Sequence, residues 1–368
     1  MNNSNDELYF PEIITFNLNY QKENFWLCRN CSARSESLHY KILLPLSLQP
    51  ISIEPIPIDG INNFYNIGCY QPIPETQLPA MEVNVAYEYI EKEIDASDWL
   101  EKITFLFDEK IIKRKDYYSV SGKYSDILTI SDFEGDKIVS RMRVFKNYDF
   151  QRKGANLILV KASCPQENYT SLAEYFLHSV KYFTLINDSK WHLTEQLKSI
   201  NLYIPTNYSF YYPESWQHNE RYNSEKMSYF SLSLKEGKQL YGRIAGYFLS
   251  RQNEINKEFR SAIMQKLNFN KHIFTEKIRL NEHHEIFNKN ISELWSDTIT
   301  LKNKQNNNGE LTVFAGRIEN TWFYLIGTSP DKETNFMSWA VVKRTIDIII
   351  NSLNNYKLAY EDKFYQQP

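Results

Sequence analysis

The sequence repeats one order of elements, in which two adjacent strands are followed by an amphipathic helix. The strand patterns cover 137–145, 155–162, 311–319 and 322–328, and the helix patterns cover 169–183 and 335–353. Apolar residues alternate in the strands and recur every three to four positions in the helices. Pairs of strands packed beneath a helix predict an α+β fold of antiparallel sheets flanked by helices.

The chain is longer than a single ordinary core requires. Its 368 residues exceed the size at which hydrophobic cores stop growing and chains divide into domains. We predict an N-terminal extended arm or cap over 1–80, a first domain over 81–190 and a second domain over 200–356. Within the first region, short apolar runs are separated by prolines, which break helices and confine strands to sheet edges. These residues are Pro45, Pro50, Pro55, Pro57, Pro72, Pro74 and Pro79.

Composition and motifs argue against several classes of function. The net charge of -3 does not supply the basic face that neutralises nucleic-acid phosphates. The first six residues are polar and no apolar run reaches membrane-spanning length, so we expect a cytoplasmic protein without membrane insertion. The four cysteines do not suggest a disulfide scaffold. No phosphate-binding glycine motif or catalytic-triad signature occurs in the sequence, so we expect no cofactor.

Local patterns in the first domain place several elements. Strict alternation from Met81 to Tyr89 predicts a half-buried strand, and Ser97 or Asp98 is a suitable N-cap for the helix that follows. The Glu-Gly-Asp sequence within 133–136 predicts a hairpin turn. The basic stretch 110–115 follows acidic residues and is interpreted as a solvated helix end, with single-strand nucleic-acid binding as the alternative.

In the second domain, a strand over 208–212 runs into Pro213-Glu214-Ser215-Trp216, and a helix with an apolar stripe is predicted over 252–268. The opening 208–216 resembles the strand and Tyr-Pro-x-x-Trp motif of the Mog1/PsbP-like superfamily. The following order of strands, crossing helix, strand pair and long C-terminal helix is similar to that fold. The resemblance extends over 81–354 as a tandem pair of domains.

Resemblance to this superfamily implies binding rather than catalysis. Its members are mostly non-enzymatic binders and adaptors, including effector chaperones associated with bacterial type VI secretion. The resemblance therefore implies an adaptor or chaperone that binds a secretion effector or a subunit of the apparatus. The candidate partner-binding residues are Trp216, Tyr247, Phe248, Arg141 and Arg143.

Two other functions remain open from the sequence. Cys28 and Cys31 have the two-residue spacing of a zinc-binding pair, with Cys69 and His39 as conceivable further ligands, although no second close pair occurs. His283 and His284 add to a possible metal-dependent enzyme, but adjacent histidines point in different directions. The third interpretation is a purely structural subunit whose N-terminal arm contacts a neighbour.

Overall fold

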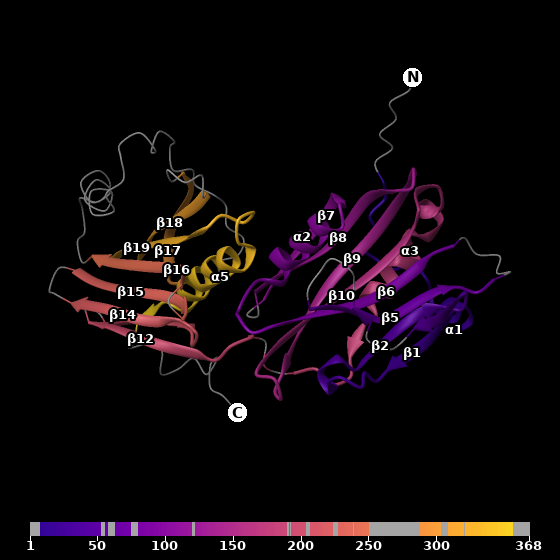
Figure 1. The fold of residues 1–368 in the computed structure, drawn as a ribbon, viewed down its shortest axis with the longest axis horizontal. Helices are drawn as coiled ribbons and strands as arrows, with labels where there is room; N and C mark the ends of the chain where they lie inside the picture. The colour runs from indigo at the N-terminus through magenta and orange to yellow at the C-terminus, as the bar shows by residue number, and fades with distance from the viewer. Residues whose placement is uncertain are drawn as a thin grey trace, which may run out of the picture. The chain divides into compact units, whose positions relative to one another are not determined.

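The chain forms two compact units, Met1–Thr194 and Glu195–Pro368, each described by itself below (Figure 1). The computed structural model describes residues 8–52, 56–57, 63–74, 80–119, 122–189, 191, 193–203, 207–223, 227–237, 239–249, 288–302, 308–319 and 321–355. The predicted helix over 252–268 and the pair His283–His284 lie outside these residues.

The first unit is built on an eight-stranded antiparallel sheet of order β3-β5-β6-β10-β9-β8-β7, with β4 also pairing β5. A second sheet has the order β1-β2-β11. The strands are β1 (Phe25–Asn30), β2 (Tyr40–Pro45), β3 (Leu48–Ser52), β4 (Ile56–Pro57), β5 (Phe64–Pro72), β6 (Glu82–Ile90), β7 (Lys110–Ser119), β8 (Gly122–Phe133), β9 (Asp136–Asp149), β10 (Gly154–Pro165) and β11 (Thr184–Leu185). The helices are α1 (Leu18–Asn24), the short 3-10 helix η1 (Glu36–Leu38), α2 (Ala96–Leu106) and α3 (Gln166–Lys181).

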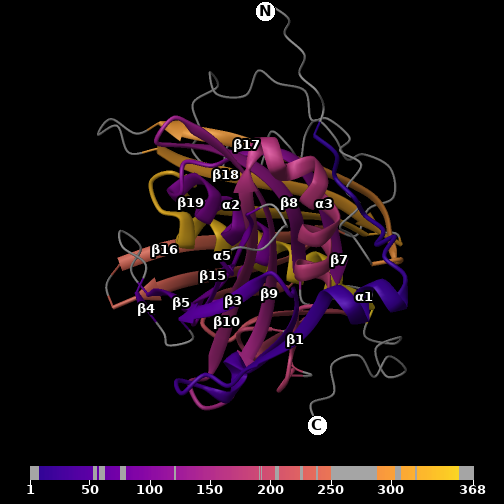
Figure 2. The same cartoon turned by 90° about the vertical axis from the view of Figure 1, so that its right-hand side faces the viewer.

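Helices α2 and α3 cover opposite faces of the large sheet, as Figure 2 shows. The α2 residue Trp99 donates its indole N–H to Glu88 on β6, at 2.5 Å. The neighbouring residue Tyr87 points the other way and joins the core beneath α3, with Phe176 of that helix. Because successive side chains of a strand alternate between faces, β6 contributes to both cores.

Two predictions about this unit differ from the structure. Over 1–80 the sequence predicts an extended arm or cap, but β5 pairs with β6 and β3 pairs with β5, so part of this region extends the main sheet. The prolines act as expected only locally, since Pro50 lies in β3 at the edge of that sheet. The stretch 110–115 is not a helix end: α2 ends at Leu106 and the basic residues belong to β7, which pairs with β8.

The predicted hairpin turn is confirmed. Phe133 and Asp136 pair across β8 and β9, leaving a two-residue loop of Glu134 and Gly135. Both loop residues have positive φ, at 53° and 93°. This is the backbone shape that matches the twist of the flanking strands in a tight hairpin.

The second unit contains a six-stranded antiparallel sheet, β14-β15-β16-β19-β18-β17, and a small sheet, β12-β13-β20. The strands are β12 (Leu197–Tyr203), β13 (Asn207–Pro213), β14 (Gln217–Asn223), β15 (Met227–Glu236), β16 (Gln239–Leu249), β17 (Ile291–Lys302), β18 (Asn308–Ile318), β19 (Thr321–Pro330) and β20 (Asn354–Asn355). Helix α5 (Phe336–Ser352) begins where the Asn335 side chain accepts from the Ser338 N–H at 3.0 Å, as an N-cap does.

Glycines let α5 and bulky rings approach the six-stranded sheet. A Cβ atom on Gly327 of β19 would lie 2.5 Å from Ile346 of α5. A Cβ atom on Gly246 of β16 would collide with the ring of Phe230 on β15. Phe230 is fully buried. Because glycine has no side chain, Ile346 and the Phe230 ring can lie closer to the sheet than any other residue at these two positions would allow.

These observations establish a sheet-rich α+β fold with several antiparallel sheets. The tandem pairing of two Mog1/PsbP-like domains stays a prediction. Among the helices that the structure describes, none combines the length and apolar character needed to cross a bilayer.

Candidate functional site

A cleft of about 440 Å³ opens in the first unit where β8 and β9 part. The register of β8 with β9 ends at the pair Asp126–Arg143, while β9 continues to Asp149 along β10. Strand β8 begins at Gly122, so its first residues and the later residues of β9 form two arms of a fork. The residues that line the cleft include Lys123, Tyr124, Arg143, Phe145, Lys146 and Phe183. We refer to this feature as the fork cleft.

The positive charge of the fork cleft centres on Arg143. The carboxylate of Asp126 binds Arg141 through two hydrogen bonds, from Nε at 3.0 Å and from Nη2 at 2.8 Å. Arg143 shares the same carboxylate through one bond from Nη2, at 2.5 Å. One negative charge therefore serves two guanidinium groups, which leaves a surplus of positive charge beside the cleft.

Arg143 also has unused hydrogen-bonding capacity. Its Nε is shielded from solvent and has no hydrogen-bond partner within the described part of the chain. The side chain is 15% exposed, whereas that of Arg141 is only 1% exposed. A buried donor left unpaired carries a desolvation cost of about 1–3 kcal/mol. Arg143 is thus the residue of this pair that a bound carboxylate or carbonyl can reach.

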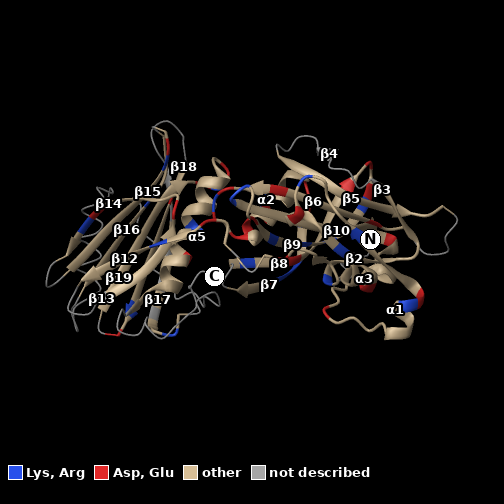
Figure 3. Cartoon of the chain, turned by 90° about the horizontal axis from the view of Figure 1, so that it is seen from below, with Lys and Arg blue, Asp and Glu red and all other residues tan. Residues whose placement is uncertain are grey.

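Two lysines add to the charge of the cleft, and each has an acidic partner. Lys146 donates to buried Glu93 at 2.7 Å and to the Ile94 carbonyl at 3.2 Å. Lys123 lies 3.2 Å from Asp116. Burial acts to raise the pKa of Asp116, but hydrogen bonds from Arg114 and Ser125 outweigh it and lower that pKa. Asp116 therefore stays ionised beside Lys123. Figure 3 marks the basic and acidic residues of the structure in blue and red.

Aromatic rings form the walls of the fork cleft. Phe145 of β9 packs on Phe183, which follows α3, with ring centroids 4.7 Å apart. On the β8 arm, Tyr124 stacks on Tyr117 at 5.3 Å and an interplanar angle of 12°. The guanidinium carbon of Arg143 lies 5.7 Å from the Tyr117 centroid. The cleft therefore combines apolar surface with a cation, the pattern of a site that orients an amphipathic ligand.

The predicted partner-binding residues of the second unit lie in its interior. Trp216 is 1% exposed and Phe248 is fully buried. Tyr247 is also buried and lies on the other face of the sheet, in a cluster with Trp322 and Tyr324. Burial raises the pKa of the Tyr247 hydroxyl. These side chains are packed against the unit's own residues, which removes them from the surface that a partner would meet.

Arg141 and Arg143 have different positions although the sequence treats them alike. Both side chains project from the α3 face of β9, but Arg141 is enclosed by Asp126 and by the ring of Phe10 at 4.2 Å. Arg143 opens into the fork cleft. Tyr124, Lys146 and Phe183 carry no sequence signal of a site, because only the folded structure brings them together around the fork cleft.

The candidate zinc ligands occupy separate environments. Cys28 is buried, with its Sγ 3.3 Å from the Tyr70 hydroxyl, and burial raises the pKa of its thiol. Cys31 is exposed, and burial raises the pKa of the Cys69 thiol. His39 places Nε2 3.0 Å from the Ser32 carbonyl oxygen. Among the described residues, no group of three or more His, Cys, Asp or Glu side chains is arranged to hold a metal ion.

Comparison with known proteins gives only distant similarities. No family model matches the chain, and no curated protein matches its sequence. Cyanobacterial PsbP (CyanoP) from Synechocystis sp. PCC 6803 is 12% identical, with a TM-score of 0.29, and the match covers 43% of this chain and 92% of that one.

Two further solved structures match over more of the chain. The immunity protein TplEi of the T6SS from Pseudomonas aeruginosa is 10% identical, covering 89% of this chain and 97% of that one, with a TM-score of 0.20. The Tle4–Tli4 complex gives 9% identity, coverage of 90% and 99%, and a TM-score of 0.20. At such scores these similarities carry no functional inference.

Proposed function

We propose that the protein acts by binding, not by catalysis, and that the fork cleft holds an extended segment of a partner protein. The observation that carries this proposal is Arg143, a partly exposed cation that, within the described part of the chain, shares the carboxylate of Asp126 with Arg141. A ligand carboxylate would complete this arrangement, since guanidinium groups bind carboxylates with matched geometry.

The walls of the cleft define the neighbouring part of the ligand. Phe145, Phe183 and Tyr124 offer apolar surface beside the charge. An acidic side chain next to an aromatic or aliphatic one would meet both features. An extended backbone also suits a site between diverging strands, because a peptide can align with exposed strand edges.

A peptide-display selection tests this proposal. Full-length protein is immobilised and challenged with a random peptide library, in parallel with the variants Arg143→Gln and Arg152→Gln. Arg152 is a matched control, because it lies outside the cleft with its guanidinium over the Tyr89 ring. We expect wild type and Arg152→Gln to enrich peptides with Asp or Glu beside an apolar residue.

The Arg143→Gln variant should lose this enrichment by roughly 10- to 100-fold, since removing a hydrogen-bonded charge pair costs about 1.5–3 kcal/mol. Equal enrichment by all three proteins, or none above background, would refute the cleft as the binding site. Hydrogen exchange of β9 in each variant checks that the sheet is intact.

We also propose the finer role implied by the sequence resemblance, an adaptor or chaperone for an effector or subunit of a bacterial type VI-like secretion system. Its support is the Tyr208 to Trp216 motif and the order of elements after it. Affinity purification of tagged protein from its native host, with mass spectrometry and metal analysis of the eluate, tests this role. A stoichiometric secretion protein supports it, and zinc without a protein partner contradicts it.

A further inference from the structure

The fork cleft is closed at one end and open at the other. Its closed end is the pair Asp126–Arg143, from which the register of β8 with β9 continues to Phe133–Asp136. On the other side of this pair, β8 stays paired with β7 and β9 stays paired with β10, so the two arms separate. We call the pair Asp126–Arg143 the apex of the cleft. A chain that lies between the arms therefore meets a paired ladder when it reaches the apex.

The cleft is also bounded on both faces of the sheet. Ala96, the first residue of α2, lines it, and so does Phe183, which follows α3. These two helices cover opposite faces of the sheet (Figure 2). An extended segment that continued past the apex would have to leave the plane of the sheet over one of these walls. The geometry therefore favours a chain that ends at the apex over one that passes it.

The charge at the apex selects the kind of chain end. The Asp126 side chain is buried and accepts hydrogen bonds from both Arg141 and Arg143. Arg143 is partly exposed and lines the cleft, so it is the charged group of the apex that a ligand reaches. A guanidinium group binds a carboxylate and repels an ammonium group. The chain end that fits the apex is a carboxyl terminus.

An acidic residue marks the opposite end of the cleft. Asp188 is exposed and lines the cleft. Its neighbours fix its position along β9, since the Asn147 side chain donates to the Asn187 carbonyl at 3.0 Å and accepts from the Ser189 N–H at 2.9 Å. Asn147 lies four residues beyond Arg143, or roughly 13 Å along an extended strand. The cleft therefore runs from a basic residue at the apex to an acidic residue about four positions away.

An apolar wall lies beside the apex. Phe145 is two residues from Arg143, on the same face of β9. Its ring packs on Phe183, with centroids 4.7 Å apart, and Tyr124 lines the other arm. An apolar side chain at the end of a ligand would contact these rings while its terminal carboxylate reaches Arg143.

We propose that the fork cleft holds the carboxyl terminus of the partner protein, with the terminal carboxylate at Arg143 and an apolar final side chain at Phe145. A basic residue about three to five positions before the end then lies near Asp188. This inference rests on the proposed function and narrows it, because an internal acidic segment supplies no chain end at the apex.

Two display libraries of the same random peptides test the inference on the full-length protein. In one library each peptide ends in a free carboxyl group, and in the other a linker follows its last residue. We expect the free-terminus library to be enriched roughly tenfold over the other, with apolar final residues. Equal enrichment of both libraries that is lost in Arg143→Gln would keep the cleft as the binding site and overturn the terminal carboxylate. Enrichment of neither library would overturn this inference and the proposed function together.

Peptides from the free-terminus library are then synthesised as free acids and as carboxamides. Amidation should weaken binding to the wild type roughly 10- to 100-fold, because it removes the charge that Arg143 binds. The same change should weaken binding to Arg143→Gln by no more than about threefold, whereas Arg152→Gln, outside the cleft, should behave as the wild type does. An equal effect of amidation on the wild type and on Arg143→Gln would place the carboxylate elsewhere and overturn the proposal.

The variant Asp188→Asn tests the direction of the bound chain. The wild type should bind peptides with Lys or Arg about four residues before the end roughly 2- to 5-fold more tightly than peptides with Gln there, as expected for an exposed ion pair. Asp188→Asn should lose this preference. A wild type without the preference, or a variant that keeps it, would overturn the assigned direction. Hydrogen exchange of β9 in each variant checks that the arms of the fork are intact.

Discussion

The two large sheets stabilise their interiors in different ways. The sheet of the first unit buries ionic groups, with Arg141 and Asp126 each 1% exposed and Glu93 bonded to Lys146. On the α5 side, the sheet of the second unit is packed around glycines such as Gly246 and Gly327, and around aromatic rings. Buried ion pairs require precise partners, whereas apolar packing requires matched volumes. The ionic packing of the first unit places charge near the surface, where a ligand can meet it. The glycine packing of the second unit adds no charge, because glycine has no side chain.

The largest effect that sharpens this contrast is expected at Asp126. Replacing it by Asn removes the only anion that the structure shows bonded to Arg141 and Arg143, and should destabilise the first unit by about 3–5 kcal/mol. Asp132→Asn, on the exposed end of the same strand, is the control and should cost less than about 0.5 kcal/mol. Urea dependence of hydrogen exchange in β9 and β10 measures both, and similar values would show that the ionic core is not essential.

Acid should weaken the first unit through His178. This α3 residue is fully buried and stacks on Phe25 at 3.9 Å, and burial lowers its pKa to about 4. As pH falls through 6.5, the unfolded chain takes up the proton first, so stability is lost from there down to about pH 4. The loss specific to this group should approach 3 kcal/mol. Urea midpoints between pH 7 and 4.5 should fall more for wild type than for His178→Phe, and parallel curves would exclude this role.

In the second unit, packing predicts a smaller but position-dependent effect. Gly246→Ala forces a methyl group into the buried ring of Phe230 and should cost about 1–3 kcal/mol. Gly327→Ala meets the end of Ile346 at 2.5 Å, which can rotate, and Val342 Cγ1 at 2.9 Å, so it should cost less than Gly246→Ala, which meets the Phe230 ring at a shorter distance. Thermal unfolding of the two variants is compared with wild type. Equal costs would mean that the space around the two glycines adapts equally well.

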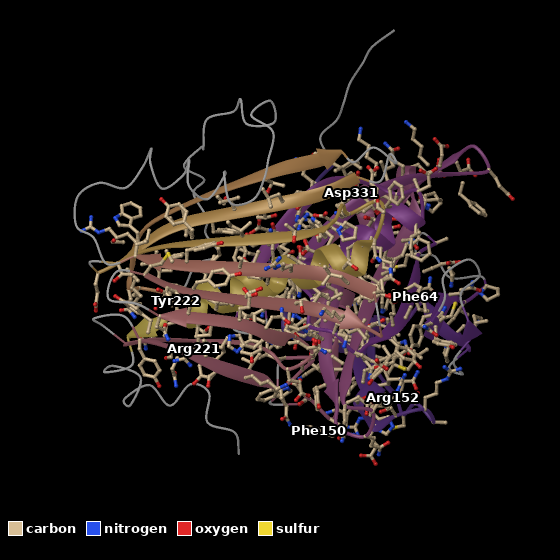
Figure 4. The ribbon with its side chains drawn as sticks, turned by 60° about the vertical axis from the view of Figure 1, so that its left-hand side comes forward. Phe64, Phe150, Arg152, Arg221, Tyr222 and Asp331 are labelled. Carbon is tan, nitrogen blue, oxygen red and sulfur yellow. The ribbon has the colours of Figure 1, made fainter. Side chains whose placement is uncertain are left out.

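The smallest effect is expected where a charge is exposed. Arg152 lies 3.4 Å from the Tyr89 centroid near Phe150, on the β9–β10 turn (Figure 4). Because exposed cation–π contacts contribute about 0.5–1 kcal/mol, Arg152→Gln should change the unfolding free energy by no more than that. If Arg152→Gln lowers the unfolding free energy as much as Asp126→Asn does, burial in the core does not explain how the ionic groups stabilise the first unit.

Periodicity predicted much of the fold, because strands and helices leave local patterns. The strand pair and helix over 137–183 appear as β9, β10 and α3, and the pair and helix over 311–353 as β18, β19 and α5. The prolines of 1–80 predict an arm or cap, but Tyr40, Ile42 and Leu44 alternate in the same region and are buried in β2. Long-range pairing, such as β6 with β10, leaves no local pattern of its own.

The candidate site was harder to predict than the fold. Arg143 was found as an alternating cation, but the same pattern also selected Arg141, which Asp126, Phe10 and Pro11 enclose. The fork cleft depends on where the β8–β9 register ends, and on Phe183 arriving from beyond α3. Trp216 was selected for a motif whose physical basis is packing, and the structure buries it. Residue types indicate chemistry, but tertiary pairing decides which of them reaches a ligand.

The fork between β8 and β9 has a thermodynamic consequence. Its arms are continuous with paired strands, β8 with β7 and β9 with β10, so the shape of the cleft is set before any ligand arrives. Binding to such a preformed site orders few groups of the protein, and the entropic cost falls mainly on the ligand. Affinity should therefore rise steeply when the ligand itself is made rigid in an extended form.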